Sequence, residues 1–199
     1  MNFLAHIFLS DSMDELMVGN FIGDFVKGKK YEKYATPYKI GILLHREIDS
    51  FTDSHPTVNQ SKDRLRANYR HYAGVVTDMF YDHFLATNWL KYSNQSLESF
   101  VTSAYSTLQR HKHNMPLRAK QMLPYMIEGN WLLSYSEIEG IDKALNGMSR
   151  RTKFKSEMEK ASTDLVKHYN AFNLEFNTFF PDIITHSNKV KEKLLQEWD

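Results

Sequence analysis

The sequence contains no cysteine among its 199 residues. This absence excludes disulfide bonds, thiolate metal sites and cysteine nucleophiles, and it fits a protein of the reducing cytoplasm. Glycine and proline are also scarce, with 8 and 5 residues. So few helix breakers exclude collagen-like, propeller and loop-rich architectures and favour long helices.

An excess of charge of one sign is also lacking. The 25 Lys and Arg residues nearly balance the 24 Asp and Glu residues, which leaves a net charge of +1. No bulk charge therefore indicates nucleic acid or a membrane surface as a partner. No apolar run approaches the roughly 18 residues of a membrane span, and no positively charged leader precedes an apolar stretch at the N-terminus. We expect a cytoplasmic protein that binds neither nucleic acid nor a membrane.

Apolar residues are abundant, at 42%, and 14% of the chain is aromatic. They recur every three to four residues, which is the helix period, and alternating strand patterns are missing. The sequence thus predicts an all-α fold, a single-domain helical bundle over residues 1–199. The expected helices cover residues 2–9, 13–27, 37–51, 56–72, 74–92, 96–113, 117–134 with a kink at Pro124, 135–147 and 152–179, and Pro181 then separates a terminal amphipathic helix.

Several polar residues have the i, i+4 spacing that puts two side chains on one face of a helix. The pairs are His45 and Asp49, Asp78 and Asp82, and Asn20 and Asp24. Asp53 lies one turn beyond Asp49, His83 directly follows Asp82, and His6 lies in an apolar stretch.

These His and Asp residues are surrounded by large apolar ones. Carboxylates buried together repel one another and lose their hydration, and a bound cation removes that cost. Imidazole and carboxylate ligands without thiolate suit Mn, Fe, Mg or Zn. Since four predicted helices each contribute a His or an Asp, the pattern favours a metal site inside the bundle.

Each residue also has a simpler interpretation. The His45–Asp49 pair can be an ordinary hydrogen-bonded pair, and Asp53 can cap the helix that begins at Pro56. Asp78 can pair with an arginine, while Asn20 and His6 can be hydrogen-bonded core residues. Two basic stretches, 62–70 and 150–155, can be solvated helix faces.

Five blocks of the sequence, in this order, resemble the acyl carrier protein phosphodiesterases, a divergent all-helical family related to HD-type metal phosphohydrolases. They are Asn2-Phe3-Leu4-Ala5-His6, residues 19–28 with Asn20 and Asp24, His45-Arg46-x-Ile48-Asp49 with Thr52-Asp53, Asp82-His83-Phe84, and Leu145-Asn146-Gly147-Met148. The resemblance extends to Pro181. Two positions differ: the His-Asp doublet of HD enzymes is reversed here as Asp82-His83, and Phe8 stands where some members have a second histidine.

The resemblance implies an HD-phosphohydrolase-like fold and hydrolysis of the phosphodiester that links 4′-phosphopantetheine to a serine of holo-acyl carrier protein. It implies a divalent metal, Mn²⁺ first, with Mg²⁺ or Fe²⁺ as alternatives, and a water molecule activated by that metal. The partner would be holo-acyl carrier protein, whose acidity implies a basic docking surface.

The predicted site residues fall into three sets. The catalytic set is Asp24, His45, Asp49 and Asp82. The metal-ligating set is His6, Asp24, His45, Asp78, Asp82 and His83. The substrate-binding set is Asn20, Arg46, Arg150 and Arg151, with Arg46 as a phosphate clamp.

Two other functions remain open at this point. One is an HD-type phosphohydrolase acting on a nucleotide or another small phosphate ester. The other is a metal-free helical binding protein whose buried polar pairs have only a structural role.

Overall fold

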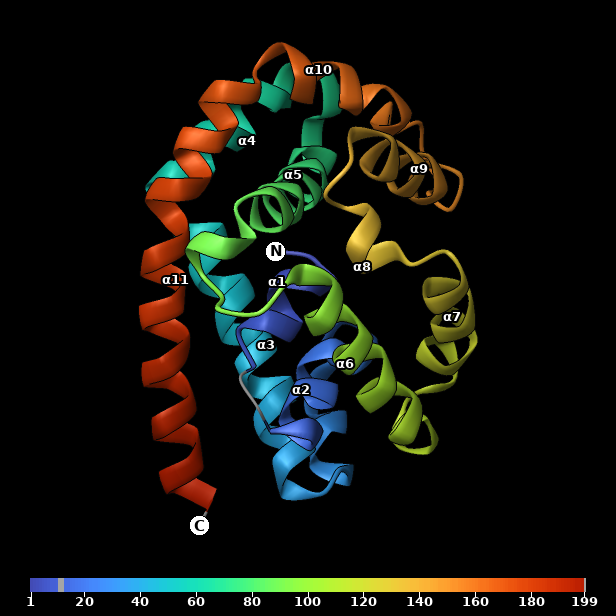
Figure 1. Cartoon of the computed structure of the whole chain (residues 1–199), viewed down its shortest axis with the longest axis vertical. Coiled ribbons are helices and arrows are strands. Elements are labelled where there is room, and N and C mark those ends of the chain that lie inside the picture. The colour runs from blue at the N-terminus through green and yellow to red at the C-terminus, as the bar shows by residue number, and fades with distance from the viewer. Residues whose placement is uncertain (11–12, 199) are drawn as a thin grey trace.

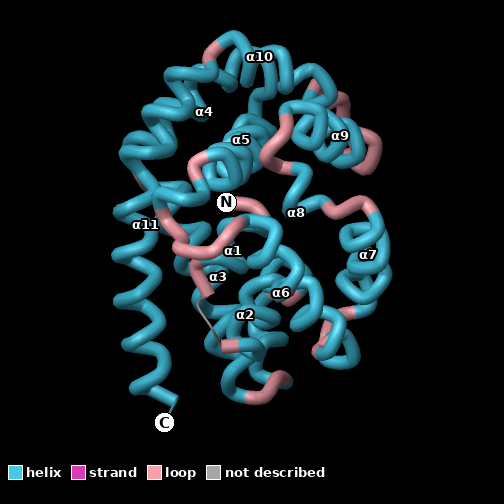
Figure 2. The backbone as a smooth tube through the Cα atoms, in the orientation of Figure 1, coloured by secondary structure: helices cyan, strands magenta, loops and turns pink. Residues whose placement is uncertain are grey.

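The computed structural model describes residues 1–10 and 13–198, and within these ranges every regular element is a helix (Figures 1 and 2). The all-α prediction is confirmed. The α-helices are α1 (Phe3–Phe8), α2 (Asp14–Phe21), α3 (Thr36–Ser54), α4 (Pro56–Tyr69), α5 (Ala73–Thr87), α6 (Leu97–Arg110), α7 (Leu117–Glu128), α8 (Trp131–Ser134), α9 (Ile138–Ser149), α10 (Ala161–Lys167) and α11 (Tyr169–Trp198). The 3-10 helices are η1 (Gly23–Phe25), η2 (Gly28–Lys33), η3 (Arg70–Tyr72), η4 (Trp89–Lys91), η5 (Lys112–Asn114) and η6 (Met158–Lys160).

The α-helices lie close to the predicted ones, but three segments differ. The helix expected over 117–134 is divided into α7 and α8, because Asn130 between them adopts a left-handed backbone with φ 43°. The helix expected over 13–27 ends at Phe21 and is followed by η1 and by η2, which begins at Gly28, a residue with a left-handed backbone of φ 58°. The long helix expected over 152–179 is divided. Residues 150–157 are not helical, and α10 ends at Lys167, just before α11 begins.

Pro181 does not separate two helices; it lies inside α11. A proline within a helix costs about 3 kcal/mol. The buried residues Phe172, Phe176, Phe179, Phe180 and Ile183 flank it on both sides. Because each buried side chain contributes roughly 1.5–3 kcal/mol, packing along α11 outweighs the cost of the proline.

Helices α2 and α3 cross at two glycines. A Cβ atom on Gly41 would lie 2.8 Å from the Cα of Gly19 and 2.1 Å from the carbonyl oxygen of Leu16. Only glycine permits this approach. Asn20 directly follows Gly19, and His45 lies four residues after Gly41, so the crossing of the two helices places Asn20 beside His45.

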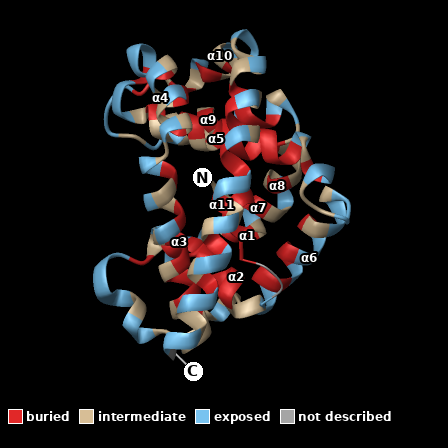
Figure 3. Ribbon diagram, turned by 90° about the vertical axis from the view of Figure 1, so that its left-hand side faces the viewer, coloured by how far each residue is buried: buried red, intermediate tan, exposed pale blue. Residues whose placement is uncertain are grey.

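Helix α1 packs against α2 and α5. Residues from the start of the chain therefore lie beside residues 73–87 in the interior of the molecule. Figure 3 shows buried residues of α1 and α2 in the interior and exposed residues along the outer turns. Helix α11 runs along one side of the molecule (Figure 1) and packs against α3, α4 and α5. No helix in the described part of the chain is long and apolar enough to cross a membrane.

Candidate active site

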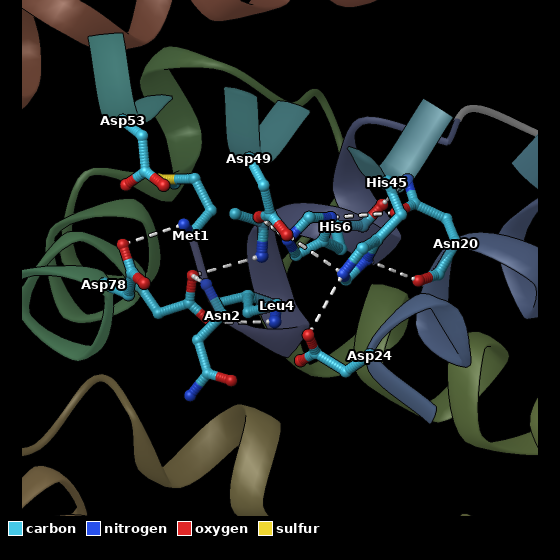
Figure 4. Close-up of polar contacts among 12 residues, drawn as sticks. Met1, Asn2, Leu4, His6, Asn20, Asp24, His45, Asp49, Asp53 and Asp78 are labelled. Atoms are coloured by element: carbon cyan, nitrogen blue, oxygen red, sulfur yellow. Dashed lines mark hydrogen bonds and ion pairs between the residues drawn. The ribbon is translucent and has the colours of Figure 1, made fainter. Parts of the chain in front are cut away.

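Two buried histidines and an aspartate meet near the start of the chain (Figure 4). The rings of His6 on α1 and His45 on α3 are stacked, with centroids 4.0 Å apart. One ligand atom from each of His6, His45 and Asp49 lies within 4.8 Å of the other two. These three residues, the His–His–Asp group, can hold a metal ion.

Asn20 fixes the orientation of both rings. Its side-chain amide donates to the carbonyl oxygen of His6 and to Ser10 Oγ, each at 2.8 Å. Its Oδ1 is then an acceptor, so His6 Nδ1, at 2.8 Å, must donate the proton. The Asn20 carbonyl oxygen accepts from His45 Nδ1 at 2.9 Å. Both imidazoles therefore direct Nε2 toward Asp49.

Asn20 is fully buried, and both amide protons and Oδ1 are already engaged by protein groups. The sequence predicted that this side chain binds substrate. The structure instead gives it the place of a positioning residue behind the two histidines.

The Nε2 atoms face the Asp49 carboxylate. His6 Nε2 lies 3.2 Å from Oδ1, and His45 Nε2 lies 3.2 Å from Oδ2. His6 Nε2 is buried and makes no hydrogen bond. With the proton on Nδ1, this Nε2 presents a lone pair to a carboxylate oxygen, so two acceptors face each other. A cation bound by both atoms would remove that repulsion, and two imidazoles with one carboxylate suit a divalent transition metal.

Burial and mutual charge shift every pKa in the group. Burial, with the nearby His45, lowers the pKa of His6 to about 4. Burial opposes the charged form of His45 too, but hydrogen bonds to Asp24 and Asp49 raise its pKa to about 9. Burial also opposes ionisation of Asp49, yet its imidazole partners lower its pKa. In the metal-free group His45 thus carries a positive charge, His6 is neutral and Asp49 is negative, and a bound cation can replace the charge of His45.

Asp24, on η1, lies at the edge of the group. Its Oδ1 is 3.4 Å from His45 Nε2, and its side chain is 70% exposed. The hydrogen bond from His45 lowers the pKa of Asp24. Gly23 makes this approach possible, because a Cβ there would lie 2.2 Å from the His45 ring. Asp24 is the member of the site that faces solvent.

The structure does not bring Asp82 into the His–His–Asp group. Its carboxylate accepts backbone N–H groups of Asn2, Leu4 and Ala5, at 3.2, 2.8 and 3.3 Å. Burial raises the pKa of Asp82 to about 7, although these amides and the nearby terminal amino group oppose the shift. Asp82 therefore anchors the first turn of α1, which carries His6.

Asp78 and His83 are also engaged elsewhere. Asp78 Oδ1 lies 2.9 Å from the α-amino group of Met1, where an arginine was one expectation. His83 Nδ1 lies 2.8 Å from the carbonyl oxygen of Tyr135, and Nε2 lies 3.0 Å from the Tyr169 hydroxyl. Because both ring nitrogens have protein partners, His83 is not positioned to ligate a metal here.

Asp53 and Arg46 have structural contacts. Asp53 accepts from Lys62 Nζ at 2.7 Å, and His55 caps α4 instead by accepting from the backbone N–H of Thr57. Arg46 donates to the carbonyl oxygens of Val26 and Gly28, at 3.0 and 2.6 Å. Both bonds come from Nη2, so Arg46 holds the segment after η1 in place.

A groove of about 1000 Å³ begins at Asp24 and Asn2 and continues along α8 and α9. Arg150 and Arg151 also line it. Its large apolar wall residues are Phe3, Phe25, Met122, Trp131, Tyr135 and Met148. Met122 and Trp131 were not predicted, because apolar residues at helical spacing have the same pattern in a core and in a groove.

The model of the family described as acyl carrier protein phosphodiesterase matches residues 1–183. A protein of that name from Photorhabdus laumondii is 34% identical over 182 residues, 91% of this chain and 92% of its own. Its namesake from Enterobacter sp. (strain 638) is 34% identical over 188 residues, 94% and 97% of the two chains. That from Escherichia coli (strain K12 / DH10B) is 30% identical over 190 residues, 95% and 98%. No solved structure matches this chain, so kinship with the HD fold stays a prediction.

Proposed function

The chain belongs to the acyl carrier protein phosphodiesterase family, and we propose that it hydrolyses the phosphodiester of holo-acyl carrier protein. The products would be apo-acyl carrier protein and 4′-phosphopantetheine. The observation that carries the proposal is the His–His–Asp group, which belongs to the matched region and can hold a metal ion.

His6, His45 and Asp49 would hold the ion, with Mn²⁺ as the first candidate and Mg²⁺ or Fe²⁺ as alternatives. The unpartnered Nε2 of His6 and the mixed nitrogen and oxygen donors support this assignment. When bound, a divalent cation supplies charge neutralisation for the phosphodiester and acidifies a water molecule.

The protein's own groups would position the reactants. Asn20 holds both imidazoles with Nε2 facing Asp49. Asp24, exposed at the start of the groove, can accept a hydrogen bond from the attacking water and so orient it. The water oxygen forms the new bond to phosphorus, the bond from phosphorus to the serine Oγ breaks, and a proton is transferred to that Oγ, whose departure needs it.

The carrier protein would dock beside the groove at Arg150 and Arg151. In the described part of the chain no carboxylate pairs with either residue, and Arg151 Nε donates only to the Gly147 carbonyl oxygen. The basic residues at 62–66 are instead neutralised by Asp53, Glu175 and Asp63. The segment at 150–151 is thus the better candidate for contact with an acidic partner.

The test is the conversion of holo- to apo-acyl carrier protein, followed by intact-protein mass spectrometry. The wild-type chain with Mn²⁺ should remove the phosphopantetheine group, and chelation should stop the reaction until metal is restored. We expect kcat/KM to fall by at least about a hundredfold in each of His6→Ala, His45→Ala and Asp49→Asn. Loss of a ligand should cost more than loss of a residue that only hydrogen-bonds a ligand, which typically costs about 10- to 100-fold.

His55→Ala is the matched control, because His55 pairs with Asp182 away from the group; it should retain activity. Full activity in the chelated protein would contradict the metal-dependent mechanism. No conversion of holo-acyl carrier protein, together with turnover of a nucleotide, would favour a phosphohydrolase for small esters. Neither turnover nor metal binding would favour a metal-free binding protein.

A further inference from the structure

The groove beside the site is much larger than a phosphodiester needs. Its volume of about 1000 Å³ is at the upper end of small-molecule sites, roughly 300–1,000 Å³. A phosphodiester alone would occupy only the end at Asp24. The remaining length requires an elongated group attached to the phosphate.

The groove borders the candidate metal site at Asp24. Asp24 lines the groove, and its Oδ1 lies 3.4 Å from His45 Nε2. Asn2 lines the same end, and its backbone N–H donates to Asp82. A phosphate at the His–His–Asp group would therefore extend one of its ester chains directly into the groove.

The walls identify the chemistry of that chain. Phe25 and Met148 line the groove and are half-buried, so part of each apolar side chain is accessible there, while Tyr135 is buried behind the wall. Ser134 adds a hydroxyl that donates to the Trp131 carbonyl oxygen and keeps its lone pairs as acceptors. Glu137, Glu139 and Lys143 also line the groove. Apolar walls fit methyl and methylene groups, and the carboxylates and the hydroxyl are acceptors for amide N–H donors.

We propose that this groove holds the pantetheine arm of the substrate, with its dimethyl carbon and methylenes along the apolar walls and its phosphate at the His–His–Asp group. The inference rests on the proposed function and adds to it which side of the phosphodiester the protein encloses. The serine of the carrier protein then lies on the open side, and hydrolysis leaves the phosphate on the enclosed arm.

The test fills the groove at Ala144, a half-buried wall residue on α9. In Ala144→Trp, kcat/KM on holo-acyl carrier protein should fall by about tenfold or more, the scale of a misfit in a shaped pocket. Turnover of methyl 4-nitrophenyl phosphate, which lacks an arm, should stay within about twofold. Gln121→Trp, at an exposed position on α7 outside the groove lining, is the control and should change neither activity.

Binding supplies a readout that does not need turnover. By calorimetry, the wild-type chain should bind 4′-phosphopantetheine at least about tenfold more tightly than inorganic phosphate, and Ala144→Trp should abolish that difference. Ala144→Leu serves if the larger variant does not fold, as judged by circular dichroism.

The outcomes separate the two proposals. If wild-type protein removes the prosthetic group but both Ala144 variants keep full kcat/KM and affinity, the arm lies elsewhere and only the function stands. If wild-type protein binds 4′-phosphopantetheine in an Ala144-dependent way but does not hydrolyse holo-acyl carrier protein, the groove assignment stands and the proposed reaction is wrong. Equal binding of 4′-phosphopantetheine and phosphate would overturn the groove assignment.

Discussion

At the scale of single residues, one neutral side chain determines how the site presents its ligands. Asn20 engages His6 through its side chain and His45 through its backbone carbonyl. An imidazole whose Nδ1 proton is held in this way offers Nε2 to a metal, and loss of such a partner typically costs 10- to 100-fold in metal affinity. Asn20 thus matters for the metal site although it is fully buried and touches no substrate.

Asn20→Ala is therefore expected to lower Mn²⁺ affinity by about 10- to 100-fold, because the His6 ring loses its acceptor and is free to rotate. Calorimetric titration of the chelated protein measures this effect. The same variant should also lose about 1–3 kcal/mol of unfolding free energy, since buried polar partners are left unpaired.

Ser10→Ala is the matched control. It removes another buried partner of the Asn20 amide and leaves the contact between Asn20 and the His6 ring in place. It should cost similar stability and keep the metal affinity. If both variants lose metal affinity equally, the effect is one of general destabilisation and the positioning role is wrong.

At the scale of secondary-structure elements, packing outweighs local helix preference. Gly19 and Gly41 would weaken isolated helices, yet they permit the crossing of α2 and α3 that brings Asn20 to His45. In α11, the buried phenylalanines on either side of Pro181 keep the helix continuous.

Because Pro181 is exposed and interrupts the hydrogen-bond ladder of α11, Pro181→Ala should raise the free energy of unfolding. We expect a gain of about 2 kcal/mol. Removing the proline restores about 3 kcal/mol of helix stability, but it also raises the conformational entropy of the unfolded chain, which offsets part of that gain. Urea unfolding of the full chain measures it. Thr178→Ala, an exposed position one turn earlier, should change stability by less than about 0.5 kcal/mol. A destabilised Pro181→Ala would show that the proline stabilises α11.

At the scale of the whole molecule, net charge conceals a local asymmetry. The chain carries only +1, and the basic side chains of α4 are paired with carboxylates. Arg150 and Arg151 instead line the groove without acidic partners among the described residues. An acidic partner would therefore be attracted to one region of a nearly neutral surface.

Arg150→Glu together with Arg151→Glu should lower kcat/KM on holo-acyl carrier protein by about tenfold at low ionic strength, since charges at the rim of an interface mainly accelerate encounter. The loss should shrink in high salt, which screens exposed charges beyond about 8 Å at physiological strength. Steady-state rates across a salt series measure this dependence.

Lys167→Glu with Lys189→Glu changes the net charge by the same amount on α10 and α11, away from the groove lining, and should have little effect. Methyl 4-nitrophenyl phosphate should be turned over normally by both double variants. Equal loss on the two substrates would mean that Arg150 and Arg151 support the fold or the chemistry, and not docking.

The helical class, most helix positions and the candidate histidines of α1 and α3 could be predicted from sequence alone. Period and composition are local properties, and breaker-poor amphipathic segments form helices wherever they pack. The blocks containing His6, Asp24, His45 and Asp49 also sufficed to indicate the family, which the full-length relatives support.

Which polar residues contact one another depends on the tertiary structure. His45–Asp49 and Asp78–Asp82 have the same i, i+4 spacing. The packing of each helix against its neighbours places His45–Asp49 beside His6 and Asp78–Asp82 beside the first residues of the chain. The same holds for Asn20, whose partners lie 10, 14 and 25 residues away, and for the groove, whose walls come from segments over a hundred residues apart. Such contacts depend on packing between elements, and no periodicity along one element encodes them.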